Sequence, residues 1–235
     1  MKMRKAAGRI LITGGAVLML SALLLFLYNR YEDARAGRQA ERLLAEVQSA
    51  IGQESGQEEA WGQKNSGQPS GASSGPQAEQ EGQGAEVLKE ADMEQTREEL
   101  SPEMPVVQIG KYGYIGYLSI PSLNLELPVM SEWDYNRLKL APCRQFGSSR
   151  TDDLVIAGHN YKKHFGPLFR LKTGAEVTFT DMEGVENHYT LQKLEILKPE
   201  AVDAVYDSGY ALVLYTCTLG GENRVVAFCD RVEER

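Results

Sequence analysis

The first constraint on the fold is a run of nineteen residues near the N-terminus, residues 10–28, without a charged side chain. As a helix this run would be about 28 Å long, roughly one hydrocarbon core of a membrane. Tyr28 and Tyr31 suit the aromatic belt at a membrane interface. Four Lys or Arg side chains lie within residues 1–9, and positive charge favours the cytoplasmic side. We therefore predict a cytoplasmic basic tip over residues 1–9, a single-pass transmembrane anchor over residues 10–28, and an extracellular remainder.

A cleaved signal peptide is the alternative explanation of this run. Ala34, Arg35 and Ala36 match the small-residue pattern of a cleavage site. However, the apolar run exceeds the ~7–15 residues usual in signal peptides, and the match lies well beyond its end. Three arginines after the run oppose the predicted orientation, and two acidic residues partly offset them. We therefore favour an uncleaved anchor.

Residues 29–51 continue with good helix formers. Leu43, Leu44, Val47 and Ile51 recur at helical spacing and form an apolar stripe. We predict a juxtamembrane helix that extends the anchor. Self-association along the stripe is the alternative use of these side chains.

Residues 52–105 differ sharply in composition. The first part, residues 52–85, is rich in Gly, Gln, Ser and Glu and cannot bury enough apolar surface to fold. Residues 52–105 hold twelve acidic and three basic side chains, a net charge of −9 against −8 for the whole chain. The acidity therefore belongs to a linker, which we expect to be an extended spacer that lifts the following domain off the membrane. No basic patch supports a nucleic-acid partner.

Residues 106–235 form the predicted folded domain. Short strand-like runs alternate with turn signals, which is typical of an all-β barrel or sandwich. A short helix is expected over residues 133–140. The expected strands cover residues 114–120, 125–129, 154–157, 176–180, 188–195, 211–215 and 225–228.

The last two runs predict a β-hairpin that carries a reactive group. The first run reaches Cys217, a loop over residues 218–223 holds two adjacent glycines, and the second run begins at Arg224. If the loop closes symmetrically, Cys217 lies directly opposite Arg224, with Cβ atoms about 5 Å apart. A nearby cation favours the thiolate, and a guanidinium can also hold an oxyanion.

A nucleophilic cysteine also needs an acid or base. His159 follows a strand-like run and Gly158, so it too would emerge at a strand end. The number of cysteines is three, which does not indicate a disulfide framework. Cys143 and Cys229 are expected to be small buried hydrophobic residues. In the hairpin register, Cys229 points to the face opposite Cys217.

Two segments carry a family resemblance. The segment VIAGHN contains His159, and the segment LYTC ends at Cys217, with Arg224 one short loop later. This pattern resembles the sortases, the cysteine transpeptidases of Gram-positive cell envelopes. Thr216 also matches the family, whereas Val213 stands where the family usually has Thr. The resemblance covers roughly residues 112–232 and implies a closed β-barrel of about eight strands.

The resemblance also implies a mechanism. Cys217 would attack a carbonyl in an LPxTG-like C-terminal sorting signal of a surface protein and form a thioester. His159 would protonate the leaving amine, and Arg224, with Thr216, would support the oxyanion. An amine of a peptidoglycan precursor or a pilin lysine would then resolve the thioester, and no cofactor or metal is expected.

The subclass within the family is open. Residues 158–160 and 165–168 resemble class B sortases. The connection over residues 199–209 is short, however, whereas class B enzymes carry a long helical insertion there. A class D-like assignment, or an unplaced clostridial-type branch, is therefore the alternative, and the sorting motif is open with it.

The remaining polar candidates are interpreted as structural. His164 is expected to be a solvated loop residue, and His188 a surface residue on a strand. Asp181, Glu183 and Glu186 are expected to lie in a solvated turn rather than in a cation site. Two other functions stay open: a non-catalytic, membrane-tethered β-domain that binds envelope proteins, and another envelope cysteine transpeptidase, although the Ser-x-Gly-Cys arrangement of L,D-transpeptidases is absent.

Overall fold

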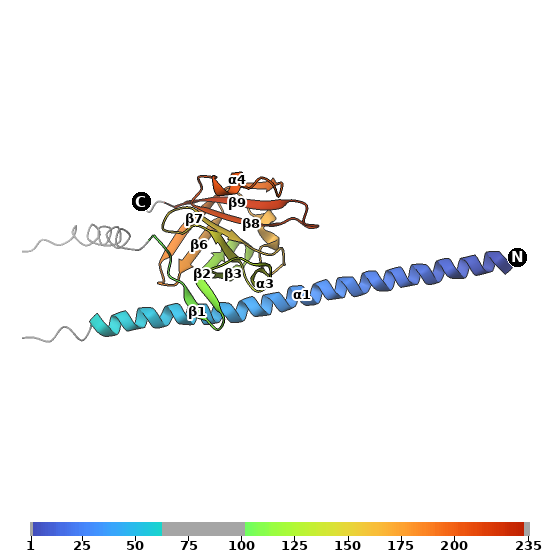
Figure 1. The fold of residues 1–235 in the computed structure, drawn as a ribbon, viewed down its shortest axis with the longest axis horizontal. Helices are drawn as coiled ribbons and strands as arrows, with labels where there is room; N and C mark the ends of the chain where they lie inside the picture. The colour runs from blue at the N-terminus through green and yellow to red at the C-terminus, as the bar shows by residue number, and fades with distance from the viewer. Residues whose placement is uncertain (1, 63–101, 233–235) are drawn as a thin grey trace, which may run out of the picture.

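One long helix and one small barrel make up the described parts of the chain (Figure 1). The computed structural model describes residues 2–62 and 102–232. Helix α1 (Lys2–Gly62) is unbroken, so it includes the predicted anchor, the predicted juxtamembrane helix and the first eleven residues of the predicted linker. Residues 63–101, which hold most of that linker, lie outside the described residues.

The N-terminal half of α1 is apolar enough to cross a membrane. Helical residues 12–52 contain an 18-residue window of mean hydropathy 1.8, and none of its side chains is buried against the rest of the protein. A helix of this kind is compatible with the predicted membrane anchor. The predicted orientation and the uncleaved state of the anchor stay predictions.

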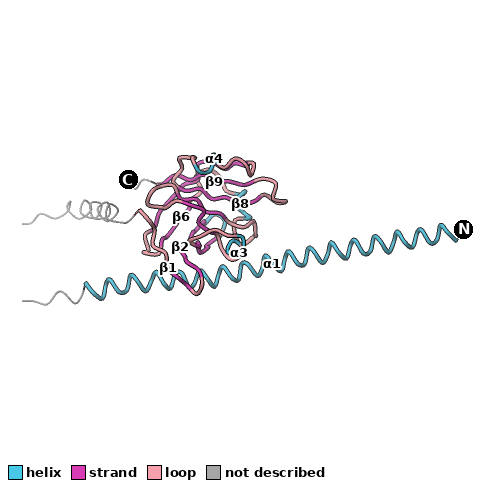
Figure 2. The backbone as a smooth tube through the Cα atoms, in the orientation of Figure 1, coloured by secondary structure: helices cyan, strands magenta, loops and turns pink. Residues whose placement is uncertain are grey.

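Nine strands form the sheet, and eight of them close into a barrel (Figures 1 and 2). The closed ring runs β2-β3-β4-β5-β8-β9-β7-β6, and β6 pairs back onto β2, while β1 lies beside β2 outside the ring. The prediction of a closed barrel of about eight strands is therefore confirmed. The strands are β1 (Val107–Ile109), β2 (Tyr112–Ile120), β3 (Leu125–Met130), β4 (Cys143–Phe146), β5 (Leu154–Ala157), β6 (Glu176–Asp181), β7 (Glu186–Leu197), β8 (Leu212–Cys217) and β9 (Arg224–Arg231).

Short helices fill the connections between strands. They are η1 (Pro121–Leu123), α3 (Tyr135–Leu138), η2 (Gly166–Arg170) and α4 (Asp203–Tyr206). Helix α3 begins two residues later than predicted, because Asp134 caps it by accepting hydrogen bonds from the backbone N–H groups of Asn136 and Arg137, and it ends two residues earlier. The connection from β7 to β8 holds only α4, which agrees with the short segment read from the sequence.

Closure of the ring depends on a glycine in β2. Gly116 has φ +143° and pairs with Val129 of β3 on one side and Asp181 of β6 on the other. A Cβ at this position would overlap the carbonyl oxygen of Thr180. Only glycine allows the two strand backbones to approach so closely.

Alternate residues of the final hairpin face two different apolar clusters. Leu212, Leu214, Ala227 and Cys229 point into the barrel core. Val213, Val226 and Phe228 point outward. Leu197 at the end of β7, and Val205 and Tyr210 of the β7–β8 connection, pack on them. The odd-numbered positions of β8, which include Cys217, therefore belong to the outer face.

Helix α1 packs directly on the barrel. Ala36, Ala40, Leu44 and Val47 are buried, at a spacing that brings them to one side of the helix. Val47, together with partly buried Leu43 and Ile51, joins a cluster with Tyr114, Met130, Cys143 and Met182 of the barrel. The predicted stripe thus packs within the chain.

This packing bears on where the folded domain begins. The barrel lies against α1 shortly after the predicted anchor, because the apolar stripe of α1 packs on it. Most of the predicted spacer lies outside the described residues, so its role stays a prediction. Met104, inside the predicted linker, is buried in the barrel core, so the folded part begins slightly before residue 106.

Candidate active site

Cys217 and Arg224 face each other at the end of the last hairpin, as predicted. They are paired across β8 and β9, where Cys217 ends one strand and Arg224 begins the next. Both side chains are partly exposed. Opposed residues of an antiparallel pair share one face of the sheet. The thiol and the guanidinium therefore lie on the same face at the mouth of the loop.

The loop after Cys217 is closed by its own hydrogen bonds. Thr218 donates its N–H to the Asn223 carbonyl at 2.9 Å, and Asn223 donates its N–H to Thr218 Oγ1 at 3.1 Å. Arg224 Nη1 donates to the carbonyls of Gly221 and Asn223. Within the described residues, the other guanidinium nitrogens have no partner and no carboxylate pairs with this arginine. Those donors are available to an incoming carbonyl oxygen.

His159 reaches the same end of the barrel on the neighbouring strand. β5 runs parallel to β8, with Ala157 beside Tyr215 and the Gly158 N–H donating to the Tyr215 carbonyl at 3.0 Å. Extending this register by two residues brings His159 level with Cys217. The Asn160 side chain also donates to the Thr218 carbonyl at 3.3 Å, which ties the two strand ends together. The fold thus brings together the three residues singled out in the sequence.

The surroundings of His159 include a residue that the sequence analysis missed. The Tyr161 ring stacks on the His159 ring with 3.8 Å between centroids and 14° between planes. His159 Nδ1 is buried and has no hydrogen-bond partner within the described residues. Burial lowers the pKa of His159 below its ordinary value, although the Asn160 side chain and the charge of Asp33 oppose this. In the sequence, the only indication of this contact was that an aromatic residue, Tyr161, stands two positions after His159.

Thr216 is placed differently from the other three candidates. It pairs with Val225, so its side chain lies on the face of β8 opposite Cys217. Its side chain is 2% exposed, and Oγ1 has no hydrogen-bond partner in the described part of the chain. The hydroxyl is therefore turned toward the core, and it is the backbone of Thr216 that borders Cys217.

The other two cysteines are buried and lie away from the site. Cys143 and Cys229 are fully buried, and burial raises the pKa of each thiol to about 12. Cys229 pairs with Leu212 and faces the core, opposite to Cys217 as predicted. All three cysteines are free thiols. Cys217 is the only partly exposed cysteine of the three.

The prediction of a solvated loop position for His164 is wrong. The side chain is 0% exposed and lies edge-on to Tyr161, with 5.5 Å between ring centroids. Neither ring nitrogen makes a hydrogen bond within the described residues, and burial lowers the pKa of His164 to about 4. The backbone of Ala36 in α1 is near enough to oppose that shift. The covering helix is distant in sequence, so the polar loop gave no sign of it.

The predicted solvated turn after β6 is also wrong in one respect. Asp181 is fully buried and pairs with Arg150 at 3.0 Å, while its other oxygen accepts the N–H groups of Glu183 and Val185. Glu183 also pairs with Arg150. Within the described residues no group of three potential metal ligands occurs. His188 is partly exposed on β7, as predicted, and lies 3.2 Å from Thr178 Oγ1.

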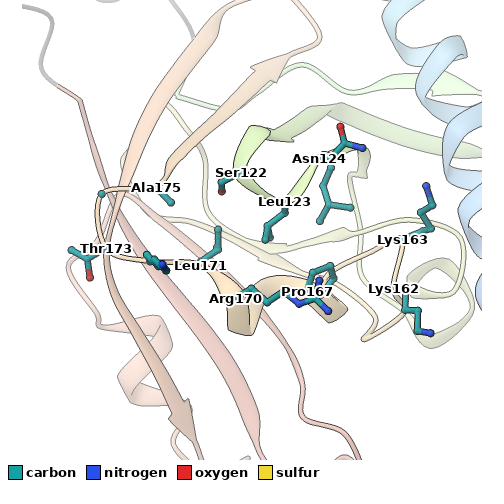
Figure 3. Close-up of a pocket in the computed structure, with 13 residues that line it drawn as sticks. Ser122, Leu123, Asn124, Lys162, Lys163, Pro167, Arg170, Leu171, Thr173 and Ala175 are labelled. Atoms are coloured by element: carbon teal, nitrogen blue, oxygen red, sulfur yellow. The ribbon is translucent and has the colours of Figure 1, made fainter.

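A cavity of about 650 Å³ lies on another side of the barrel (Figure 3). It opens between η1, η2 and the turn over residues 172–175, and Lys162, Lys163, Arg170 and Lys172 line it. None of Cys217, Arg224 and His159 lines this cavity. The candidate site is therefore an open strand-end surface rather than this pocket.

Comparison with known proteins identifies the domain. Residues 118–232 match a family described as the sortase domain. This part of the chain is a sortase domain. The sortase A of Bacillus anthracis is 30% identical over 127 residues, which is 52% of this chain and 60% of that relative.

Solved sortase structures resemble the barrel at lower identity. Sortase C1 from Streptococcus agalactiae is 26% identical, with a TM-score of 0.47, and the match covers 55% of this chain and 72% of that one. Sortase A from Corynebacterium diphtheriae is 18% identical, with a TM-score of 0.48, and the match covers 64% of this chain and 85% of that one.

Proposed function

We propose that this chain is a membrane-anchored cysteine transpeptidase that joins surface proteins to an envelope acceptor. The substrate is a surface protein with an LPxTG-like C-terminal sorting signal. The acceptor is an amine of a peptidoglycan precursor or of a pilin lysine. The observation that carries the proposal is the convergence of Cys217, Arg224 and His159 at one end of a sortase barrel. The anchor over residues 10–28 holds the enzyme in the cell membrane with its barrel outside.

The first half of the reaction cleaves the sorting signal. The Cys217 thiolate attacks the carbonyl carbon of the scissile peptide bond, and the free guanidinium donors of Arg224 bind the resulting oxyanion. The carbon–nitrogen bond then breaks, and protonated His159 gives its proton to the departing amine. The protein remains attached to Cys217 as a thioester.

The second half transfers the protein to the acceptor. The incoming amine attacks the thioester carbonyl, and His159, now neutral, takes the proton from that amine. The carbon–sulfur bond breaks and regenerates the thiolate. Burial lowers the pKa of His159, which favours the neutral ring of this stage and disfavours the protonated ring that the first half requires. Water replaces the amine when no acceptor is present, which gives slow hydrolysis.

The test uses the full chain in detergent micelles with peptides of the LPxTG and NPxTx types and triglycine as the acceptor. Mass spectrometry should find cleaved peptide, an amine-joined product and an acyl adduct on Cys217. The Cys217→Ala variant should give none of these. Replacing His159 with alanine should slow cleavage by at least about 100-fold, the usual contribution of a general acid. Cys229→Ala is the matched control, because this cysteine lies on the other face of the same hairpin.

A non-catalytic binding domain predicts a different outcome. In that case no peptide is cleaved, and Cys217 reacts with a thiol-selective alkylating agent no faster than the cysteine of a short unstructured peptide. Faster alkylation of Cys217 than of that peptide, without cleavage, would indicate an activated nucleophile whose sorting signal differs from both peptide types.

A further inference from the structure

The loop over residues 160–164, which follows His159, is held by helix α1. The backbone N–H of Lys162 donates to Asp33 Oδ1 at 3.1 Å. Lys163 Nζ lies 3.8 Å from Glu41 Oε1, and Figure 3 shows its side chain directed toward the helix. A Cβ on Gly37 would lie 2.8 Å from Lys163 Cγ, so the helix backbone rests directly on the stem of this lysine.

The same loop connects the helix to the His159 ring. Tyr161 stacks on His159 on one side and meets His164 edge-on on the other. His164 is buried next to the backbone of Ala36, which is itself 3% exposed. A continuous set of contacts therefore runs from α1 through His164 and Tyr161 to the His159 ring.

Charged side chains of α1 also affect the pKa values of Tyr161 and His159. Burial raises the pKa of Tyr161, and the charges of Glu32 and Asp33 add to this effect. The carboxylate of Asp33 also opposes the effect of burial on His159. The first turns of α1 beyond the predicted membrane span are thus close enough to influence the histidine.

From these contacts we infer that α1 is a positioning element for His159, and that Asp33 and Gly37 are its positioning residues. The inference rests on the proposed function, in which His159 moves the proton. The helix orders the loop, the loop fixes Tyr161, and Tyr161 sets the plane of the imidazole. A misplaced general acid loses proton-transfer efficiency without losing substrate binding, because Cys217 and Arg224 stand on other strands.

Two substitutions in the full chain, reconstituted in nanodiscs, test the inference. Gly37→Leu forces a side chain into the space of Lys163 and should separate the loop from the helix. Gly52→Leu is the matched control on the same helix, because a Cβ there meets nothing within 4 Å. Asp33→Ala removes the acceptor of the Lys162 N–H, whereas Asp33→Asn keeps an acceptor oxygen and should rescue most of the loss.

The first readout is the NMR signal of the His159 ring, observed in protein labelled with ¹³C at histidine Cε1. The stacked Tyr161 ring shifts this resonance in the wild-type protein. Gly37→Leu and Asp33→Ala should move the resonance of the neutral ring, and Gly52→Leu and Asp33→Asn should not. The titration midpoint is compared only between Gly37→Leu and Gly52→Leu, because both Asp33 substitutions remove a charge that raises the pKa of His159. This readout needs no substrate, so it separates failure of the inference from failure of the proposed function.

The second readout is the kinetics of peptide cleavage. Gly37→Leu should lower kcat by about ten-fold or more with KM nearly unchanged, since small displacements of a catalytic group carry large rate costs. Unchanged His159 resonances in both Gly37→Leu and Asp33→Ala would overturn the inference. A loss of kcat that Gly52→Leu shares equally would overturn it as well. If Gly37→Leu does not fold, the Asp33→Ala and Asp33→Asn variants alone test the inference. Asp33 is only partly buried, so we expect both of these variants to fold.

Discussion

Replacing His164 should remove a large part of the acid sensitivity of the barrel. The ring is fully buried, and burial lowers its pKa from the ordinary 6.5 to about 4. Between these two values the unfolded chain binds a proton at this position and the folded chain does not. The free energy of unfolding must therefore decrease as the pH falls from about 6.5 toward 4. At about 1.4 kcal/mol per pKa unit, His164 should account for a loss of about 2 kcal/mol between pH 7 and pH 5.

The measurement is the free energy of unfolding of the full chain in a non-ionic detergent, from urea titrations followed by near-ultraviolet circular dichroism. In the His164→Met variant, an apolar and flexible side chain fills the space of the ring. Because neither ring nitrogen of His164 makes a hydrogen bond within the described residues, the substitution leaves no polar group without its partner. Between pH 7 and pH 5, the free energy of unfolding of this variant should decrease by about 2 kcal/mol less than that of the wild type.

His188→Gln is the control for this experiment, because it removes a partly exposed histidine from the same barrel. The free energy of unfolding of this variant should differ between pH 7 and pH 5 by the same amount as that of the wild type. The carboxylates titrate equally in all three proteins, so they cancel in the comparison. An identical pH dependence in wild type and His164→Met would refute the assignment of acid sensitivity to this ring.

Three further outcomes follow from the packing of the barrel. Iodoacetamide should label only Cys217 in the native protein and all three cysteines in urea, as counted by intact mass, because the other two thiols are buried with a pKa of about 12. Asp181→Ala should lower the free energy of unfolding by about 3–5 kcal/mol, since it leaves Arg150 without its buried partner, whereas Glu186→Gln at the surface should change it by less than about 0.5 kcal/mol. Gly116→Ala should destabilise the barrel far more than Gly110→Ala, where a Cβ meets open space and the left-handed backbone alone costs about 1–2 kcal/mol; equal melting temperatures of the two would contradict the role of Gly116 in ring closure.

The parts of the fold that were predictable from the sequence have local causes. Strand alternation and a six-residue loop were enough to pair Cys217 with Arg224, because the register of a hairpin follows from where its loop closes. Two strands were missed for equally local reasons. β1 has three residues, and β4 has the mixed sequence CRQF with an irregular register against β5, so neither shows a clear alternation.

The parts that were not predictable depend on partners far away in the chain. The polar loop around His164 is covered by Ala36, and the acidic turn at Asp181 is neutralised by Arg150. In each case the local composition indicates exposure, and tertiary packing overrides it. The apolar stripe on α1 was recognisable as a stripe, but periodicity contains no information about which surface covers it.

If α1 anchors the domain in a membrane as proposed, its unbroken course fixes the distance between the membrane and the candidate site. A helix rises about 1.5 Å per residue, so Asp33 stands only about 8 Å beyond Tyr28, at the end of the predicted span. The helix is continuous from the predicted span to Asp33, and Asp33 accepts a hydrogen bond from the backbone N–H of Lys162 in the barrel. A substrate with a membrane segment of its own must then present its scissile bond within a few extended residues of that segment, at about 3.3 Å each. Such an enzyme would select its substrates by the distance between their membrane segment and the scissile bond, as well as by the sorting motif.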